Sequence, residues 1–244
     1  MGRMSMTPLF VLKQLTKKHW NAQENDELFS DITTTIERPE RIALLGKSGQ
    51  GKSTLLRILA KLDFIDSGEI YFNGQLMNEV DSRTWRTNIC YVEQQATMLP
   101  GTLKDNLMTS SKIHNRSFNE ELASSLMKEV GLDYLDWEKL AADLSGGEKQ
   151  RIALVRSLLL QPKVLLLDEI TASLDPQSKE LVEKLLIKLH QTEKIAFIWV
   201  THDTEQAKNI SERIWYMEDG KLASDLKTSE FFGDQSSFPT QVIL

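Results

Sequence analysis

The sequence is poor in the features that mark secreted, membrane-spanning and nucleic-acid-binding proteins. Its one cysteine, Cys90, excludes an internal disulfide bond and is typical of a reducing compartment. No apolar run reaches the roughly 18 residues that a transmembrane helix needs, and the opening MGRMSMTPLF lacks the apolar stretch of a signal peptide. With 29 Lys and Arg against 35 Asp and Glu, the net charge of −6 disfavours a nucleic-acid partner. We therefore expect a cytoplasmic protein that reaches a membrane only through a partner.

What the sequence does contain is an alternation of strand-like and helix-like segments at both ends. The segment RIWYMEDGKLAS predicts a hairpin that turns at Asp219-Gly220. Residues 102–160 instead follow mostly helical periodicity. These patterns predict an α/β fold with a parallel-sheet core, some antiparallel sheet and an inserted helical subdomain. Apolar runs predict strands at 9–15, 41–45, 68–75, 88–94, 163–168 and 196–202.

A glycine-rich stretch, GKSGQGKS at 46–53, lies between a predicted strand and a predicted helix. It fits the phosphate-binding pattern G-x-x-x-x-G-K-[ST]. Glycines let the backbone turn its N–H groups toward a phosphate, and the following helix adds the positive end of its dipole. We expect Lys52 to bind the β- and γ-phosphates and Ser53 to bind Mg²⁺. The predicted nucleotide-binding residues here are Gly46, Lys47, Ser48, Gly49, Gln50, Gly51, Lys52, Ser53 and Thr54.

A later apolar run, VLLLDEIT, carries two carboxylates to the end of a strand. Asp168 is the expected carboxylate on the Mg²⁺ side, and Glu169 directly after it could polarise an attacking water. The strand AFIWVTH ends in the same way at His202. Because ligands bind at the carboxyl ends of strands in open α/β sheets, we expect His202 beside the γ-phosphate. Glu169 and His202 are therefore the predicted catalytic residues.

A second glycine stretch, LSGGEKQ at 144–150, opens a long helical pattern between these two motifs. With its motifs in this order, the chain resembles the ATP-binding subunits of ABC transporters over residues 9–225. The resemblance implies a P-loop NTPase with a RecA-like core, with ATP and Mg²⁺ as cofactors. It also implies a head-to-tail homodimer in which each ATP lies between the P-loop of one chain and the signature of the other. The implied signature residues are Leu144, Ser145, Gly146, Gly147 and Glu148.

The same resemblance implies roles for isolated residues. Gln94, at the end of NICYVEQ, is implied as a nucleotide and Mg²⁺ contact, and Gln95 is the alternative one position later. The implied metal ligands are thus Ser53, Gln94 and Asp168. Asp175 in ASLDP matches the D-loop of the family. The ring that stacks on adenine falls at either His19 or Trp20.

The resemblance further implies a domain layout and a partner. It describes one domain over 9–244, with a nucleotide-binding core and β subdomain at 9–95 and 161–228. A helical subdomain occupies 96–160 and a C-terminal tail 229–244. The implied partner is an integral-membrane permease on a separate chain, which would place this protein on the inner face of the cell membrane.

The sequence also carries expectations about the transported cargo and about which class of ABC ATPase this chain belongs to. KVLLLDEITASLD followed by FIWVTHD resembles the bacterial iron-export-type FetA/YbbL group, in which Ile170 and Trp199 are expected. Import of an amino acid or another small solute is the alternative cargo. A soluble, non-transport ABC ATPase of DNA repair would carry a long coiled coil between the glycine stretches, and only about ninety residues without sustained heptads separate them here. A translation-factor ATPase would carry two such cassettes, whereas each motif occurs once.

Overall fold

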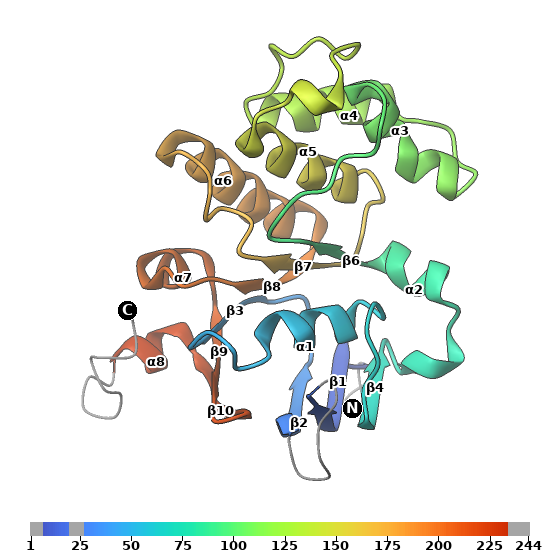
Figure 1. The fold of residues 1–244 in the computed structure, drawn as a ribbon. Helices are drawn as coiled ribbons and strands as arrows, with labels where there is room; N and C mark the ends of the chain where they lie inside the picture. Colours follow the sequence, from blue (N-terminus) through green and yellow to red (C-terminus); the bar gives the residue numbers. More distant parts are fainter. Residues whose placement is uncertain (1–6, 20–26, 234–244) are drawn as a thin grey trace, which may run out of the picture.

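The structure, a computed structural model, describes residues 7–19 and 27–233 as two sheets with helices packed around them (Figure 1). A six-stranded sheet has the order β10-β9-β3-β8-β7-β6, and a four-stranded antiparallel sheet has the order β2-β1-β4-β5. The strands are β1 (Phe10–Lys18), β2 (Glu27–Ile36), β3 (Arg41–Gly46), β4 (Ser67–Phe72), β5 (Gln75–Leu76), β6 (Ile89–Val92), β7 (Val164–Asp168), β8 (Ala196–Val200), β9 (Arg213–Glu218) and β10 (Lys221–Lys227). The helices are α1 (Lys52–Leu59), α2 (Ser82–Asn88), α3 (Leu103–Ile113), α4 (Glu120–Glu129), α5 (Gly146–Leu158), α6 (Pro176–Glu193), α7 (Thr204–Ile210) and α8 (Thr228–Gly233).

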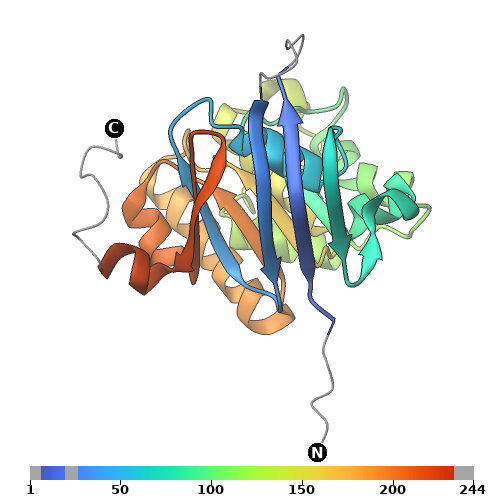
Figure 2. The same ribbon diagram turned by 90° about the horizontal axis from the view of Figure 1, so that it is seen from below.

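The parallel strands are buried on both faces, which explains why their sequences are continuous apolar runs. Along β7, Leu165 and Leu167 pack into a core formed with helices α3 to α6. Val164 and Leu166 alternate with them and pack into a second core with α1 and the antiparallel sheet. Helix α1 therefore lies between the two sheets, and the helical layer covers the opposite face of the parallel strands (Figures 1 and 2).

The predicted α/β fold with parallel and antiparallel sheets is confirmed, and the hairpin β9–β10 turns at Asp219-Gly220 as expected. Strand β2 and helices α2, α7 and α8 were not predicted from the sequence. Of the predicted tail at 229–244, residues 229–233 belong to α8, whereas 234–244 lie outside the described residues. The predicted domain boundaries stay predictions. Within the described residues, no helix combines the length and apolar character needed to cross a membrane.

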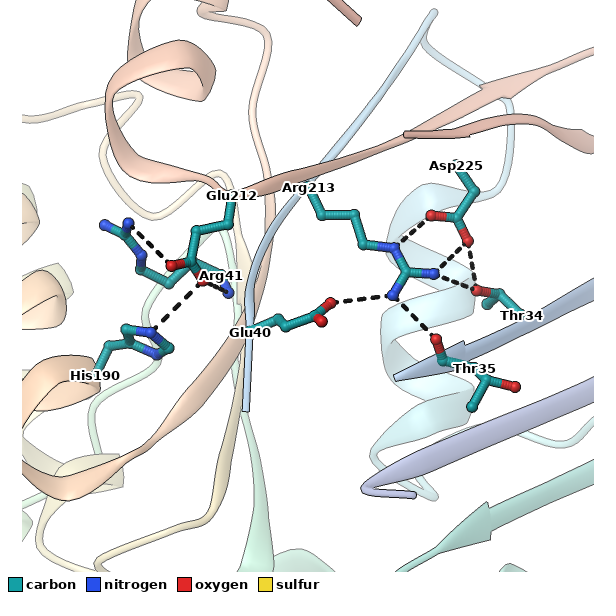
Figure 3. A network of polar contacts seen from close by, with 8 residues as sticks. All are labelled: Thr34, Thr35, Glu40, Arg41, His190, Glu212, Arg213 and Asp225. Carbon is teal, nitrogen blue, oxygen red and sulfur yellow. Dashed lines mark hydrogen bonds and ion pairs between the residues drawn. The ribbon is translucent and has the colours of Figure 1, made fainter. Parts of the chain in front are cut away.

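A charged network joins the two sheets where β3 and β9 begin (Figure 3). Arg213, the first residue of β9, donates from Nη2 to Asp225 Oδ2 at 2.7 Å. Its Nη1 donates to the backbone oxygen of Thr35 and to Glu40 Oε2, both at 3.0 Å. Two carboxylates and a carbonyl thus satisfy one guanidinium and hold β2 against β9 and β10. The network lies at the amino ends of the parallel strands, opposite the ends where the predicted site lies.

The single cysteine is part of the packed core. Cys90 on β6 is 5% exposed, and its Sγ donates to the backbone oxygen of Arg86 at 3.3 Å. Burial raises the pKa of its thiol to about 12. The thiol is therefore protonated at neutral pH and packs as a small apolar group.

Candidate active site

The glycine-rich loop connects β3 to α1 through backbone conformations that require glycine. Gly46 has φ 144°, and a Cβ atom there would lie 2.4 Å from the backbone oxygen of Met217 on the neighbouring strand β9. Gly51, with φ 85°, is the N-cap of α1 and supplies no side-chain cap. The N–H groups at the start of α1 are therefore left to a ligand, which is the arrangement of a phosphate-binding helix start.

Lys52 lies beneath this loop rather than in solvent. It is 5% exposed, and its Nζ donates to the backbone oxygens of Gly46 at 2.6 Å and Lys47 at 2.7 Å. Burial lowers the pKa of Lys52, while the negative charges of Glu169 and Asp168 oppose that shift. The ammonium group thus has local partners that hold it at the loop, where a phosphate oxygen could replace one carbonyl.

Asp168 ends β7 with both carboxylate oxygens occupied. Oδ1 accepts from the hydroxyl of Ser53 at 2.9 Å, and Oδ2 accepts from the hydroxyl of Tyr91 at 2.8 Å. Burial raises the pKa of Tyr91, and the hydrogen bond to Asp168 raises it further. The structure therefore joins Ser53 and Asp168 as predicted and adds Tyr91, which the sequence analysis missed. A tyrosine inside an apolar strand gives no signal of this contact beyond its position three residues before Gln94.

Glu169 lies between the other two polar residues at the strand ends. Its Oε2 accepts from Gln94 Nε2 at 2.8 Å, and its Oε1 lies 3.0 Å from His202 Nε2. The backbone of Glu169 has φ 48°, and its N–H donates to the backbone oxygen of Val200 on β8 at 3.1 Å. The neighbouring strand thus holds Glu169 in a left-handed conformation. The order β8-β7-β6 brings His202, Glu169 and Gln94 together at one edge of the sheet.

These groups surround a cleft of about 420 Å³ that opens at the carboxyl ends of the parallel strands. The cleft is lined by Leu28, Ser48, Gly49, Gly51, Lys52, Ser53, Thr54, Gln94, Glu169 and His202. A hydroxyl and a carboxylate 2.9 Å apart form the oxygen-rich pair that Mg²⁺ prefers. A lysine and bare helix N–H groups beside that pair suit a phosphate chain. The donor set therefore fits a magnesium nucleotide.

The predicted signature lies at the start of α5, and none of its residues is among those that line the cleft. Ser145 is the N-cap, its Oγ accepts from the N–H of Glu148 at 3.2 Å, and Glu148 returns a bond to the N–H of Ser145 at 2.6 Å. Ser145 and Gly146 are exposed, and a Cβ atom on Gly146 would meet nothing within 4 Å. Leu144 is 4% exposed and anchors this turn in the core, and Gly147 packs near Leu174.

The remaining predicted residues have separate places. Asp175 is the N-cap of α6 and accepts from the N–H of Ser178 at 3.0 Å, and hydrogen bonds from Ser178 lower its pKa. His19 is exposed after the end of β1, whereas Trp20 lies outside the described residues. Gln50 accepts from the N–H of Gly220 at 3.0 Å, so the phosphate loop contacts the β9–β10 turn. Sequence reasoning did not find that contact.

Comparisons with known proteins agree with this geometry. The ABC transporter family model matches residues 29–172. YjkB of Bacillus subtilis (strain 168), an ABC transporter ATP-binding protein by name, is 36% identical over 226 residues, which cover 92% of this chain and 89% of YjkB. The sulfate/thiosulfate import ATP-binding protein CysA of Halalkalibacterium halodurans is 37% identical over 203 residues, which cover 80% of this chain but only 56% of CysA.

Solved structures give the same result. The dimeric ATP-binding cassette MJ0796 in a post-hydrolysis state with ADP and Pi has a TM-score of 0.81 and 29% identity, covering 90% of this chain and 98% of that one. The cbiO1 protein of Clostridium perfringens, part of the cbiONQ ABC transporter complex, has a TM-score of 0.78 and 26% identity, covering 93% and 92%. The predicted resemblance is therefore confirmed at the level of the family, and this chain belongs to the ABC transporter ATP-binding proteins as an ATP-binding ATPase domain.

Proposed function

We propose that this chain is the ATP-hydrolysing subunit of an ABC transporter and that it powers a separate membrane permease through ATP-driven dimerisation. The observation that carries the proposal is the separation of two phosphate-ready helix starts. The bare start of α1 lines the cleft, whereas the exposed start of α5 does not. Two copies related by a two-fold axis can bring the α5 start of one to the α1 start of the other, twice. The dimeric cassette MJ0796 supports this arrangement.

Within each site, different residues of one chain bind the phosphates, hold Mg²⁺ and accept a proton. The loop N–H groups and Lys52 bind the phosphates, and Ser53, Asp168 and Gln94 would hold Mg²⁺. When bound, Mg²⁺ neutralises phosphate charge and polarises the phosphorus–oxygen bond. Glu169 accepts the proton of the attacking water.

His202, 3.0 Å from Glu169, orients that carboxylate and faces the γ-phosphate. From the partner chain, Ser145, Gly146 and Gly147 donate to the γ-phosphate. Asp175 at the start of α6 completes the approach of the two chains. His19 or Trp20 stacks on adenine, on the basis of the family resemblance alone.

The permease would place the complex on the cytoplasmic face of the cell membrane. Relatives with this domain include the import protein CysA and the transporter-complex subunit cbiO1, and they support a transport role without fixing the cargo. We propose iron or another metal as an exported cargo, on the sequence resemblance to the FetA/YbbL group alone. Import of an amino acid or other small solute is the alternative.

The test of the ATPase proposal is sedimentation of the purified chain with and without Mg²⁺-ATP, in parallel with hydrolysis. We expect a monomer without nucleotide and a dimer when Glu169→Gln slows turnover. A chain that hydrolyses ATP but stays monomeric at saturating nucleotide would contradict the dimer mechanism. For the cargo, cells that lack the chain should accumulate iron, and the Lys52→Ala variant should not restore efflux. Normal iron with impaired solute uptake would favour the alternative.

A further inference from the structure

The start of α5 contains a carboxylate at the place where the proposed function brings a phosphate. The side chain of Glu148 is only 10% exposed. Its Oε2 accepts from the N–H of Ser145 at 2.6 Å, and its Oε1 accepts from the hydroxyl of Tyr134 at 2.9 Å. Burial raises the pKa of Glu148, but the hydrogen bonds from Ser145 and Tyr134 and the charge of Lys139 outweigh it and lower the pKa overall. Glu148 is thus a fixed anion.

A fixed negative charge at this helix start weakens its attraction for a phosphate. The N–H groups and the helix dipole attract a phosphate, whereas a carboxylate three residues into the helix repels it. The side chain cannot turn away, because it closes the capping box with Ser145. A charge that compensates the carboxylate must therefore come from elsewhere in the structure.

Lys139 supplies that charge from outside the helix. Its Nζ lies 3.7 Å from Glu148 Oε1, and its side chain is 33% exposed. Its backbone is also held, because its carbonyl accepts from the N–H of Leu103 at 2.9 Å and its N–H donates to Asp136 at 3.1 Å. The lysine is thus fixed at the start of α5 by the first turn of α3.

Two further cations of α5 contact backbone oxygens instead of this carboxylate. Arg151, one turn further along α5, donates from Nη1 to the backbone oxygen of Val130 at 2.9 Å and from Nε to that of Gly147 at 3.3 Å. Its guanidinium supports the end of α4 and the first turn of α5. Lys149 donates to the backbone oxygen of Ala142 at 3.3 Å, and within the described residues it forms no hydrogen bond or ion pair with Glu148.

We propose that Lys139 is a positioning residue of the signature, which compensates the charge of Glu148 so that the start of α5 can accept the γ-phosphate of the partner chain's ATP. The inference rests on the proposed function, because it needs the signature to meet ATP across the dimer. A partly exposed ion pair contributes little to folding. The Lys139–Glu148 ion pair acts instead on the electrostatic potential at the start of α5, which it makes less negative for an incoming phosphate.

The experiment is a double-mutant cycle on ATP-driven dimerisation in the Glu169→Gln background, read by sedimentation against Mg²⁺-ATP. K139A should weaken the dimer about 10-fold, since a unit charge a few ångströms away is uncompensated. K139A combined with E148Q should differ from E148Q alone by less than about two-fold, because the neutral amide keeps the cap and removes the repulsion. K139R should restore dimerisation. The melting temperature of K139A should stay within about 2 °C of the parent.

The control is K149A, which removes the same charge beside the signature without touching the ion pair. Its effect should be the same with Glu148 and with E148Q. Equal losses for K139A in both backgrounds, or no loss in either, would overturn the role of Lys139. A chain that never dimerises with ATP in any variant would instead overturn the proposed function, and this inference with it.

Discussion

Helices α1 and α5 both have glycine at their starts, and they satisfy the unpaired N–H groups there in opposite ways. At the start of α1, Gly51 offers no side chain, and the nearest cation, Lys52, is buried against backbone carbonyls. At the start of α5, Ser145 and Glu148 form a complete capping box. The start of α1 has no side-chain cap of its own, whereas at the start of α5 the N–H groups of Ser145 and Glu148 are bonded before any ligand arrives.

The difference indicates that the two starts have different tasks. A bare helix start beside Ser53 and Asp168 provides binding energy and the chemical step. A capped start in which Ser145 and Gly146 are exposed keeps its shape in the single chain and remains available to a second one. The substitutions below break one start or the other, and we order them by the size of the expected effect.

Glu169→Gln should give the largest change, because it removes the proton acceptor on the α1 side while keeping the size of the side chain. We expect single-turnover ATP hydrolysis to fall about 10²- to 10⁴-fold, with nucleotide binding retained and the dimer accumulating. Ser145→Arg is the matched variant on the α5 side, and it should lose the dimer as well as hydrolysis. Hydrolysis by Glu169→Gln near the parent rate would place the base elsewhere, with His202 as the next residue to examine.

Lys52→Ala should weaken ATP binding about 10- to 100-fold, since a charge-assisted hydrogen bond to phosphate is lost. Titration calorimetry measures the affinity, and circular dichroism checks the fold. Lys128→Ala, at an exposed position of α4 outside the phosphate loop, is the control and should bind nearly as well as the parent. Undiminished affinity for Lys52→Ala with a normal spectrum would refute the role of Lys52.

Tyr91→Phe should raise the Mg²⁺ concentration needed for tight nucleotide binding about 10-fold, because Asp168 loses the hydrogen bond that orients it. Binding of a fluorescent ATP analogue at varied Mg²⁺ reports this without turnover. Tyr71→Phe is the control, since the Tyr71 hydroxyl donates to Glu69 on the antiparallel sheet. A shift that is equal in the two variants, or absent in both, would show that Tyr91 only fills space.

Ser145→Ala should lower the free energy of unfolding by about 1 kcal/mol in the absence of nucleotide, because the N-cap of α5 is lost. Thr102→Ala removes the equivalent capping box of α3 and should cost a similar amount. Only Ser145→Ala should also impair ATP-driven dimerisation. Urea denaturation measures the stabilities and sedimentation the dimers. If both variants dimerise normally, the hydroxyl of Ser145 serves the helix and not the nucleotide.

Sequence alone identified the elements whose patterns are regular. Buried parallel strands such as β3 and β7 are uninterrupted apolar runs, and Asp219-Gly220 is a strong hairpin signal. Strand β2 was missed because its buried apolar residues Phe29, Ile32 and Ile36 have helical spacing, while the buried Thr34 that restores the alternation is polar. The reason is local: Asp31 has φ 52°, and the register with β1 shifts, so the alternation of a regular strand is broken.

The candidate site divides in the same way. Lys52, Asp168, Glu169 and His202 could be selected because each lies at a strand end or in a loop pattern with a chemical meaning. The structure brings Lys52, Glu169 and His202 to one cleft, and Asp168 accepts a hydrogen bond from Ser53, which also lines it. The role of Tyr91 and the contact of Gln50 with Gly220 could not be inferred in this way, because their partners lie 77 and 170 positions away in the sequence. The pairing of Lys139 with Glu148 also joins a loop to a helix start, so no helical spacing predicts it.

Because the thiol of Cys90 is buried, the native chain offers no reactive cysteine that would compete with an introduced one in site-specific labelling. Because the thiolate is the reactive form and the pKa is raised to about 12, maleimide dyes should leave the folded protein unmodified at neutral pH. A cysteine introduced at Phe64, which is 86% exposed, would then be the single reactive position without any change to the core. Fluorescence energy transfer between donor- and acceptor-labelled copies could then report, in real time, the association of two chains when ATP is added and their dissociation after ATP is hydrolysed.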